Sequence, residues 1–181
     1  MTAPLAEFLG TMLLILLGDG VVANVVLKQT KGHDSGWIVI TTGWALAVTV
    51  AVYCTNSISG AHLNPAVTLG LASIGKFSWS LVPAYLAAQM AGAFAGAVLV
   101  WLIYLPHWRA TSDAGSKLAV FCTGPAIRHT ASNLIGEIIG TFVLVLGVLA
   151  VLSPANLLPG SGFDKGLSPA LVGVIVWSIG L

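Results

Sequence analysis

The sequence predicts an all-α membrane protein, and three observations support this fold class. Apolar residues make up 57% of the 181 positions, and Asp, Glu, Lys and Arg only 7%, whereas about 25% of the residues of a soluble domain are charged. Several uncharged stretches exceed the length of about 20 residues that a helix needs to cross a bilayer. No stretch alternates apolar and polar residues as the strands of a membrane barrel do. Because lipid offers no partners for backbone groups, helices are the expected form.

Five apolar segments are predicted to be membrane-spanning helices. They cover residues 4–27, 37–56, 81–104 and 132–152, and a fifth begins at residue 168. Residues 28–36, after the first span, form a polar segment rich in turn-forming residues. The third and fourth spans carry the glycine pairs Gly92 and Gly96, and Gly136 and Gly140. This spacing favours close helix packing, either within one subunit or between subunits.

Residues 57–74 fit neither a loop nor a span. The segment is too apolar for water, yet its helical part is too short to cross the bilayer, at about nine or ten residues and about 15 Å. Asn64 followed by Pro65 is a strong signal for the start of that short helix. The pattern predicts a half-helix that enters the membrane and returns. Irregular backbone at this depth borders a cavity or is buried in protein, so we expect a cavity.

An internal repeat relates the two parts of the chain. Glu7-x-x-Gly10-Thr11 recurs 130 residues later as Glu137-x-x-Gly140-Thr141, and Gly43 meets Gly173 at the same offset. Each copy has three spans, which is an odd number, so the second copy must enter the membrane from the opposite side. The sequence therefore predicts an inverted repeat of three transmembrane helices plus a re-entrant half-helix, which places a shared site near the midplane.

This repeat also predicts the domain organisation. Residues 1–181 form a single channel domain, with a first repeat over residues 1–105 and the start of a second over residues 131–181. A second half-helix would start 130 residues after Asn64, which lies beyond Leu181. We therefore expect the chain to be incomplete, to stop in the fifth span, and to belong to a protein of six spans and two half-helices.

The ten residues 59–68, Ser-Gly-Ala-His-Leu-Asn-Pro-Ala-Val-Thr, resemble the first Asn-Pro-Ala loop of the aquaporin, or major intrinsic protein, family. The paired Glu-x-x-Gly-Thr segments resemble the two halves of that family. Trp44 precedes Asn64 by 20 residues, where glycerol facilitators carry the Trp of their narrowest filter and water-selective channels usually carry Phe. Gly180 falls at a second filter position where glycerol channels have Gly. The family's second Asn-Pro-Ala motif and filter Arg are absent from these 181 residues.

The resemblance implies an aquaglyceroporin: a passive channel for glycerol, other small neutral polyols and water that excludes ions and protons. It also implies a multi-pass protein of the cell membrane, a homotetramer with one pore per subunit, and an N-terminus in the cytoplasm. The positive-inside rule taken alone would favour the opposite orientation. With the N-terminus in the cytoplasm, the positions outside would be Lys28, Lys31, Arg109, Lys117 and Arg128, and only Lys76 and Lys165 would lie inside.

The loop residues are expected to replace the hydrogen bonds that a permeant loses on leaving water. The carbonyl groups of Gly60, Ala61 and His62, in extended backbone, would form a series of acceptors. Asn64 would donate its side-chain amide and also cap the half-helix, which Pro65 and Ala66 continue in the Asn-Pro-Ala motif. The alternatives are a re-entrant turn buried in protein and an Asn64 that acts only as a cap.

Apolar residues would line the opposite side of the pore, and two acids would hold the loops. Trp44, Val48 and Leu63 are predicted to contact the carbon backbone of the permeant, although Trp44 could instead anchor the helix at the membrane interface. Glu7 and Glu137 lie in apolar spans, where an unpaired acid is unfavourable. The resemblance implies that each accepts backbone N–H groups of a re-entrant loop.

Other functions are less compatible with the sequence. A water-selective aquaporin would share the fold, and a proton-coupled secondary transporter would use Glu7 and Glu137 as a relay. An intramembrane enzyme would need paired catalytic groups, and none has catalytic or metal-binding spacing. There is no phosphate-binding or dinucleotide-binding motif, so no cofactor is expected. A net charge of +1 gives no reason to expect nucleic acid as a partner.

Overall fold

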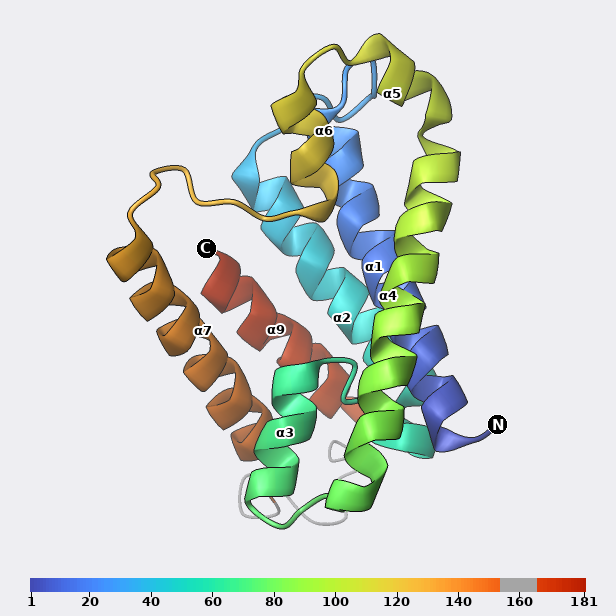
Figure 1. Ribbon diagram of the computed structural model, residues 1–181, viewed down its shortest axis with the longest axis vertical. Helices are drawn as coiled ribbons and strands as arrows, with labels where there is room; N and C mark the ends of the chain where they lie inside the picture. The colour runs from blue at the N-terminus through green and yellow to red at the C-terminus, as the bar shows by residue number, and fades with distance from the viewer. Residues whose placement is uncertain (154–165) are drawn as a thin grey trace.

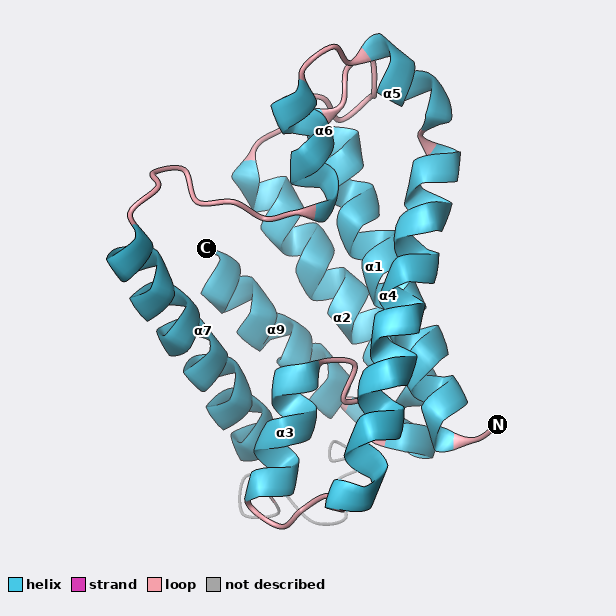
Figure 2. Ribbon diagram, viewed as in Figure 1, coloured by secondary structure: helices cyan, strands magenta, loops and turns pink. Residues whose placement is uncertain are grey.

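The computed structural model describes residues 1–153 and 166–181, and every regular element in these ranges is a helix (Figure 2). The long helices are α1 (Ala3–Val26), α2 (Trp37–Ser59), α4 (Val82–Ile103) and α7 (Thr130–Val151). The shorter ones are α3 (Pro65–Ser73), η1 (Trp79–Leu81), α5 (Leu105–Ala110), α6 (Ala114–Phe121) and α9 (Ser168–Gly180). α1, α2, the combined η1 and α4, and α7 are each long and apolar enough to span a membrane.

Proline and glycine mark many of the helix ends. A proline lies in the first two positions of α1, α3, α4, α5 and α9, where its missing N–H group has no helical partner to lose. Gly36 precedes α2, and Gly60 ends it in the left-handed conformation. A glycine adopts that conformation without a steric penalty. The same residues that punctuate the sequence therefore fix where each span begins or ends.

The helices form two groups that meet around the half-helix (Figure 1). α1 lies between α2 and α4, and the chain passes from α2 through α3 to α4 at the lower end of the figure. α9 contacts α2 and α7, while α7 also contacts α3. α5 and α6 lie at the opposite end from α3. The half-helix α3 is thus enclosed between α4 and α7, beside the lower part of α9.

Glycine permits the close approach of α1 and α4. A Cβ atom on Gly92 would lie 2.2 Å from the carbonyl oxygen of Phe8, and one on Gly96 would lie 2.6 Å from that of Met12. The first predicted glycine pair therefore packs within the subunit. The second pair does not pack in this way, because a Cβ on Gly136 would meet no atom of the described residues within 4 Å, and one on Gly140 would meet only Ile179 among them, at 3.6 Å.

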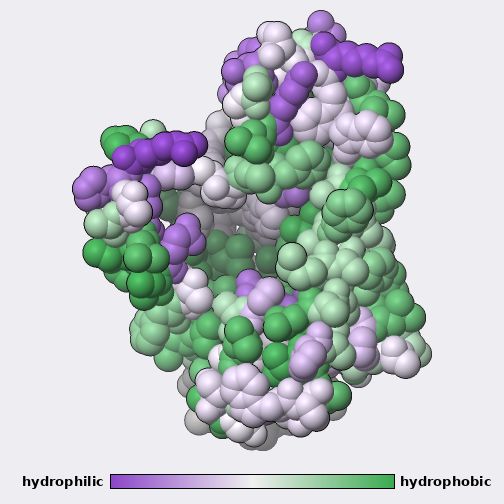
Figure 3. All heavy atoms as spheres, in the orientation of Figure 1, coloured by the Kyte–Doolittle hydropathy of each residue, from purple (hydrophilic) through white to green (hydrophobic). Residues whose placement is uncertain are grey.

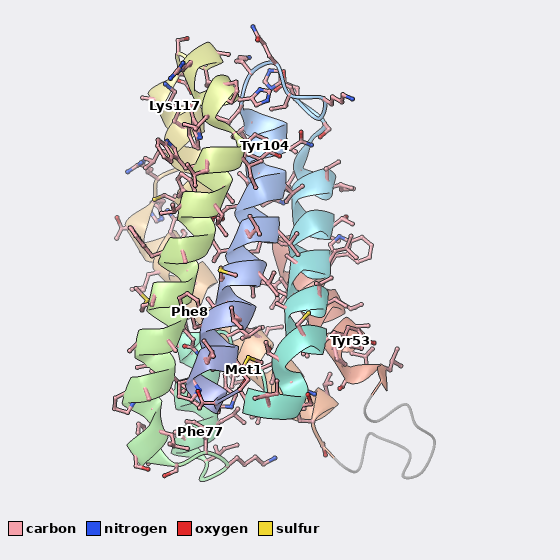
Figure 4. All side chains as sticks on the ribbon, turned by 90° about the vertical axis from the view of Figure 1, so that its right-hand side faces the viewer. Met1, Phe8, Tyr53, Phe77, Tyr104 and Lys117 are labelled. Atoms are coloured by element: carbon pink, nitrogen blue, oxygen red, sulfur yellow. The ribbon has the colours of Figure 1, made fainter. Side chains whose placement is uncertain are left out.

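The distribution of polar residues fits a molecule that crosses a bilayer. Met1 and Phe77 lie at one end of the long helices, and Tyr104 and Lys117 lie at the other (Figure 4). Hydrophilic residues gather at the α5 and α6 end, and apolar residues cover most of the middle (Figure 3). Many large apolar side chains, including Ile138 and Phe142 of α7, are exposed. Lipid can cover these apolar side chains, so their exposure does not require a protein partner.

The predicted spans agree with the helices to within a few residues, with two differences. Residues 57–59 belong to the last turn of α2 and not to the re-entrant segment. α5 and α6 were not predicted at all. α6 begins at an Asp113 N-cap, whose carboxylate accepts a hydrogen bond from the Ser116 N–H group. Such caps are a common start signal in otherwise polar connections.

Candidate functional site

The extended backbone predicted for residues 60–62 is wrong at Gly60 and Ala61, and Leu63 departs from it as well. Gly60, Ala61 and Leu63 have φ angles of 80°, 47° and 49°. Non-glycine residues adopt this left-handed region only when their surroundings impose it, and the conformational strain is about 1–3 kcal/mol for each residue. Asn64 lies in extended backbone, with φ −155° and ψ 127°. The loop therefore turns sharply instead of running straight, and something must hold it in that shape.

Glu7 of α1 holds the loop. Its carboxylate accepts hydrogen bonds from the backbone N–H groups of His62 at 3.0 Å and Leu63 at 2.8 Å. It also accepts bonds from the Ser59 hydroxyl at 2.6 Å and from Gln89 Nε2 at 2.8 Å. The side chain is 0% exposed. These hydrogen bonds explain why an acid is tolerated inside an apolar helix, because all its partners are donors.

Gln89 and Thr68 extend this network to the half-helix. Gln89 Nε2 also donates to Thr68 Oγ1 at 3.0 Å, and the Thr68 hydroxyl donates to the Asn64 carbonyl. Thr68 Oγ1 lies 3.1 Å from His62 Nδ1. Since the single hydroxyl hydrogen of Thr68 is already used, His62 Nδ1 must carry the hydrogen of that contact. The His62 ring is therefore oriented by α3, with Nδ1 as its donor.

Aromatic rings close the other side of the loop. The His62 ring lies 4.6 Å from that of Phe77 and 5.0 Å from that of Tyr85, between ring centroids. The Tyr85 hydroxyl donates to the Ser59 carbonyl at 2.8 Å. Tyr85 and Gln89 lie one turn apart on α4, so a single helix face supports both ends of the loop.

Asn64 begins the half-helix as its N-cap. Its Oδ1 atom accepts hydrogen bonds from the N–H groups of Ala66 at 2.8 Å and Val67 at 3.4 Å. Pro65 occupies the first helical position and leaves no N–H group unpaired. The Asn64 Nδ2 group has no hydrogen-bond partner among the described residues. The oxygen of this side chain is committed to the cap, and its amide is left as a donor.

A cavity of about 240 Å³ lies beside the loop. The predicted pore residues that line it are Trp44, Val48, Gly60, Ala61, His62, Leu63 and Asn64. Aliphatic side chains from α1, α3, α7 and α9 complete most of the remaining wall, as with Leu14, Val67, Val148 and Val172. The hollow between α7 and the other helices is visible on the face in Figure 3. One side of the cavity is thus polar backbone and the other is apolar.

Trp44 and Gly180 occupy different surroundings. A Cβ on Gly18 would overlap the Trp44 ring at 2.3 Å, so that glycine makes room for the indole where α2 crosses α1. Gly180 is not among the residues that line the cavity. It packs against Thr41, one turn before Trp44, and its carbonyl accepts a hydrogen bond from Trp37 Nε1 at 2.7 Å. The two predicted filter residues therefore lie toward the same end of α2, but only Trp44 reaches the cavity.

Several residues of the site were not predicted. Gln89 and Tyr85 support the loop, and Asn56 and Ser168 line the cavity. A polar Gln or Asn within an apolar span is a usable signal, because such a residue must face a partner or water. Glu137, by contrast, is exposed on α7 and has no hydrogen bond to any described residue. Within the described ranges, no group of His, Cys, Asp and Glu could hold a metal ion.

Comparisons with known proteins agree with this geometry. The family model for the major intrinsic protein family matches residues 1–181. A probable glycerol uptake facilitator protein of Thermotoga maritima is 65% identical over 181 residues, which are 100% of this chain and 74% of that protein. The glycerol uptake facilitator protein of Bacillus subtilis is 52% identical over 181 residues, which are 100% of this chain and 64% of that protein.

A solved structure supports the fold. The X-ray structure of the aquaglyceroporin from Plasmodium falciparum matches with a TM-score of 0.83 and 32% sequence identity, over 98% of this chain and 70% of that chain. The re-entrant Asn-Pro-Ala loop, the membrane-spanning helices and the family match over residues 1–181 lead to one assignment. The chain belongs to the major intrinsic protein family of integral membrane channels, and within that family to the aquaglyceroporin branch.

Proposed function

We propose that this protein is a passive channel for glycerol and other small neutral polyols that also conducts water and excludes ions and protons. One observation supports this function above the others. A cavity carries loop residues and the donor end of a half-helix on one side and aliphatic side chains on the other. A polyol has hydroxyl groups along one edge and C–H groups along the other, so it matches both walls.

The energetic problem of permeation is the loss of hydrogen bonds to water. Each hydroxyl left unpaired in a dry passage costs about 1–3 kcal/mol. The carbonyl groups of Gly60, Ala61 and His62 would accept from the permeant, and the free amide of Asn64 would donate to it. Leu63, Val48 and Trp44 would contact its carbon atoms.

Ion and proton exclusion would come from the same elements. The N-terminus of a helix carries about +0.5 elementary charge, and the α3 N-terminus at Asn64 borders the cavity. A second, opposed half-helix, anchored by Glu137 as Glu7 anchors the first, would double this field at the midplane. Cations would be repelled there, and a water molecule bound to Asn64 could not pass a proton onward.

The assembly would be a homotetramer in the cell membrane with one pore in each subunit. Exposed apolar residues on the outer faces of the helices, such as Met90 and Phe94 of α4, are compatible with contact to lipid or to a second subunit. Each subunit would conduct independently. Cross-linking in native membranes and mass determination in mild detergent would measure the number of subunits.

The proposal is tested by flux. The full-length protein would be reconstituted in lipid vesicles, which would be shrunk in a glycerol gradient and followed by light scattering as they re-swell. We expect re-swelling in glycerol at least tenfold faster than in protein-free vesicles, with no increase in proton leak measured by an internal pH dye. Glycerol flux equal to that of bare lipid would refute the proposed function. Fast water flux without glycerol flux would instead identify a water-selective channel.

A substitution at Trp44 tests the filter assignment. Trp44→Phe removes part of the apolar wall while keeping an aromatic ring against Gly18. We expect the ratio of glycerol to water permeability to fall several-fold, because the C–H edge of glycerol loses contact area. Trp101→Phe is a matched control on α4, where the ring is exposed and does not line the cavity. An unchanged ratio for Trp44→Phe would remove Trp44 from the filter.

A further inference from the structure

Two polar side chains stand out in the cavity wall beyond the loop and the half-helix. Most of the rest of the lining is aliphatic, but Asn56 of α2 and Ser168 of α9 also belong to it. Apart from Trp44, they are the remaining described lining residues with a nitrogen or oxygen atom in the side chain. Neither lies in the Asn-Pro-Ala segment.

The helix arrangement places both residues at the same end of the cavity. α2 and α9 run antiparallel, since Gly173 packs against Ala45 and Gly180 against Thr41. The Tyr53 hydroxyl donates to the Gly166 carbonyl and so fixes the start of α9 against the last turns of α2. Asn56 follows Tyr53 by less than one turn, and Ser168 follows Gly166. Both therefore lie at the end of the cavity opposite Trp44.

Asn56 has an uncommitted side chain. Its backbone carbonyl accepts the Gly60 N–H group at 3.0 Å, which closes α2, but its amide group makes no hydrogen bond to any residue that the structure describes. The Ser168 hydroxyl is likewise without a described partner, although Ser168 is 5% exposed. Polar side chains inside a membrane are unfavourable unless they meet a partner or water. The cavity is the place where Asn56 and Ser168 can meet one.

We propose that Asn56 and Ser168 form a second binding subsite for the hydroxyl groups of the permeant, at the end of the pore opposite Trp44. This inference rests on the proposed glycerol channel and names further residues of it. Both an amide and a hydroxyl can donate and accept, which is what a polyol hydroxyl requires. A molecule that leaves the Asn64 amide would pass to Asn56 without crossing a purely aliphatic stretch.

The test compares an isosteric apolar substitution with a matched control. Asn56→Leu keeps the approximate size of the side chain and removes its hydrogen bonds, and Ser57→Leu makes a similar polar-to-apolar change at the next residue, which is exposed and does not line the cavity. Loss of one hydrogen bond to the permeant changes a rate about tenfold. We expect glycerol permeability per protein to fall about tenfold in Asn56→Leu, water permeability to fall less, and Ser57→Leu to match the wild type. Asn56→Gln should recover part of the glycerol flux.

The outcomes separate this proposal from the proposed function. If wild-type vesicles do not conduct glycerol, the channel assignment fails. If the wild type conducts and Asn56→Leu has the same glycerol permeability and the same ratio to water, the subsite is refuted.

A labelling experiment covers the case in which Asn56→Leu does not reach the membrane. Asn56→Cys would be made with Cys54 and Cys122, both free and exposed, replaced by Ser. A small water-soluble thiol reagent should label Cys at this position and block glycerol flux, and glycerol should slow the labelling. Absence of labelling, or labelling without any block, would overturn the subsite.

Discussion

Glu7 and Glu137 occupy equivalent positions of the internal repeat, but their surroundings differ completely. Glu7 is 0% exposed and its carboxylate accepts four hydrogen bonds, three of them from the segment 59–63. Glu137 is exposed on α7 and has no hydrogen bond to a described residue. The helices around them differ in the same way, because Gly92 touches the backbone of α1 and Gly136 faces open space.

This contrast shows that the acid and the glycines act only in combination with a re-entrant loop and a close neighbouring helix. The same Glu-x-x-Gly-Thr pattern forms a buried anchor at Glu7, where a re-entrant loop lies beside it, and has no described partner at Glu137, for which these 181 residues hold no second Asn-Pro-Ala loop. The pattern therefore specifies a potential contact, and the neighbouring segment decides whether the contact stabilises the fold.

The largest expected effect is the loss of the Glu7 anchor. Glu7→Ala leaves the N–H groups of His62 and Leu63 and one of the two Gln89 Nε2 hydrogens buried without an acceptor, so we expect the free energy of unfolding to fall by about 3–5 kcal/mol. For a chain of this size, the thermal midpoint in detergent should fall by roughly 10 °C or more. In a chain limited to these 181 residues, which hold no second Asn-Pro-Ala loop for Glu137 to anchor, Glu137→Ala should shift it by less than about 2 °C. Equal shifts for the two variants would contradict the contrast.

The glycine comparison should give the next largest effect. Gly92→Ala places a methyl group 2.2 Å from the Phe8 carbonyl oxygen and so forces α1 and α4 apart. We expect the free energy of unfolding to fall by about 2–3 kcal/mol. Gly136→Ala meets no atom within 4 Å and should be neutral or slightly stabilising, because alanine favours helix more than glycine does. Thermal unfolding followed by circular dichroism measures the stability of both variants. A stable Gly92→Ala protein with unchanged glycerol flux would contradict the close contact.

Removal of the Tyr85 hydroxyl should reduce the stability of the anchored loop by a smaller amount. Tyr85→Phe removes the hydroxyl that donates to the Ser59 carbonyl at 2.8 Å, and we expect a loss of about 1 kcal/mol. Tyr104→Phe is the control, since the Tyr104 hydroxyl has no hydrogen bond within residues 1–153 or 166–181. The difference between the two unfolding midpoints gives the contribution of this bond, and no difference would remove Tyr85 from the anchor.

The smallest effect lies outside both compared regions, at the start of α6. Hydrogen bonds from the side chain and the backbone N–H group of Ser116 lower the pKa of Asp113 below its ordinary value of 3.8. A lowered pKa in the folded state means that the stability is present above the ordinary pKa and is lost as pH falls through the lowered one. Protection of the α6 amides against hydrogen exchange should therefore fall slightly at acid pH. Asp113→Ala should show this lower protection already at neutral pH, without further acid dependence.

Much of the fold could be predicted because apolar length and helix-start signals are local. The spans follow from uncharged stretches, and the half-helix follows from Asn64 and Pro65. The left-handed turns at Ala61 and Leu63 could not be predicted, because these residue types do not favour positive φ. The Ala61 N–H group donates to Ser59 Oγ and that of Leu63 to the Glu7 carboxylate, and these contacts form only in the folded loop. Gln89 and Tyr85 were missed because their partners belong to distant segments. The Gly92 and Gly96 pair predicts a close neighbour for α4 but does not identify it as α1.

The partners of the loop also constrain the order in which the protein can mature. The segment 59–63 depends on Glu7, which is synthesised before it, and on Tyr85 and Gln89, which are synthesised after it. Its unfavourable backbone angles therefore have their full compensation only once α4 has been inserted beside α1. The wall that this segment contributes to the cavity therefore cannot reach its final conformation until three membrane helices have been synthesised.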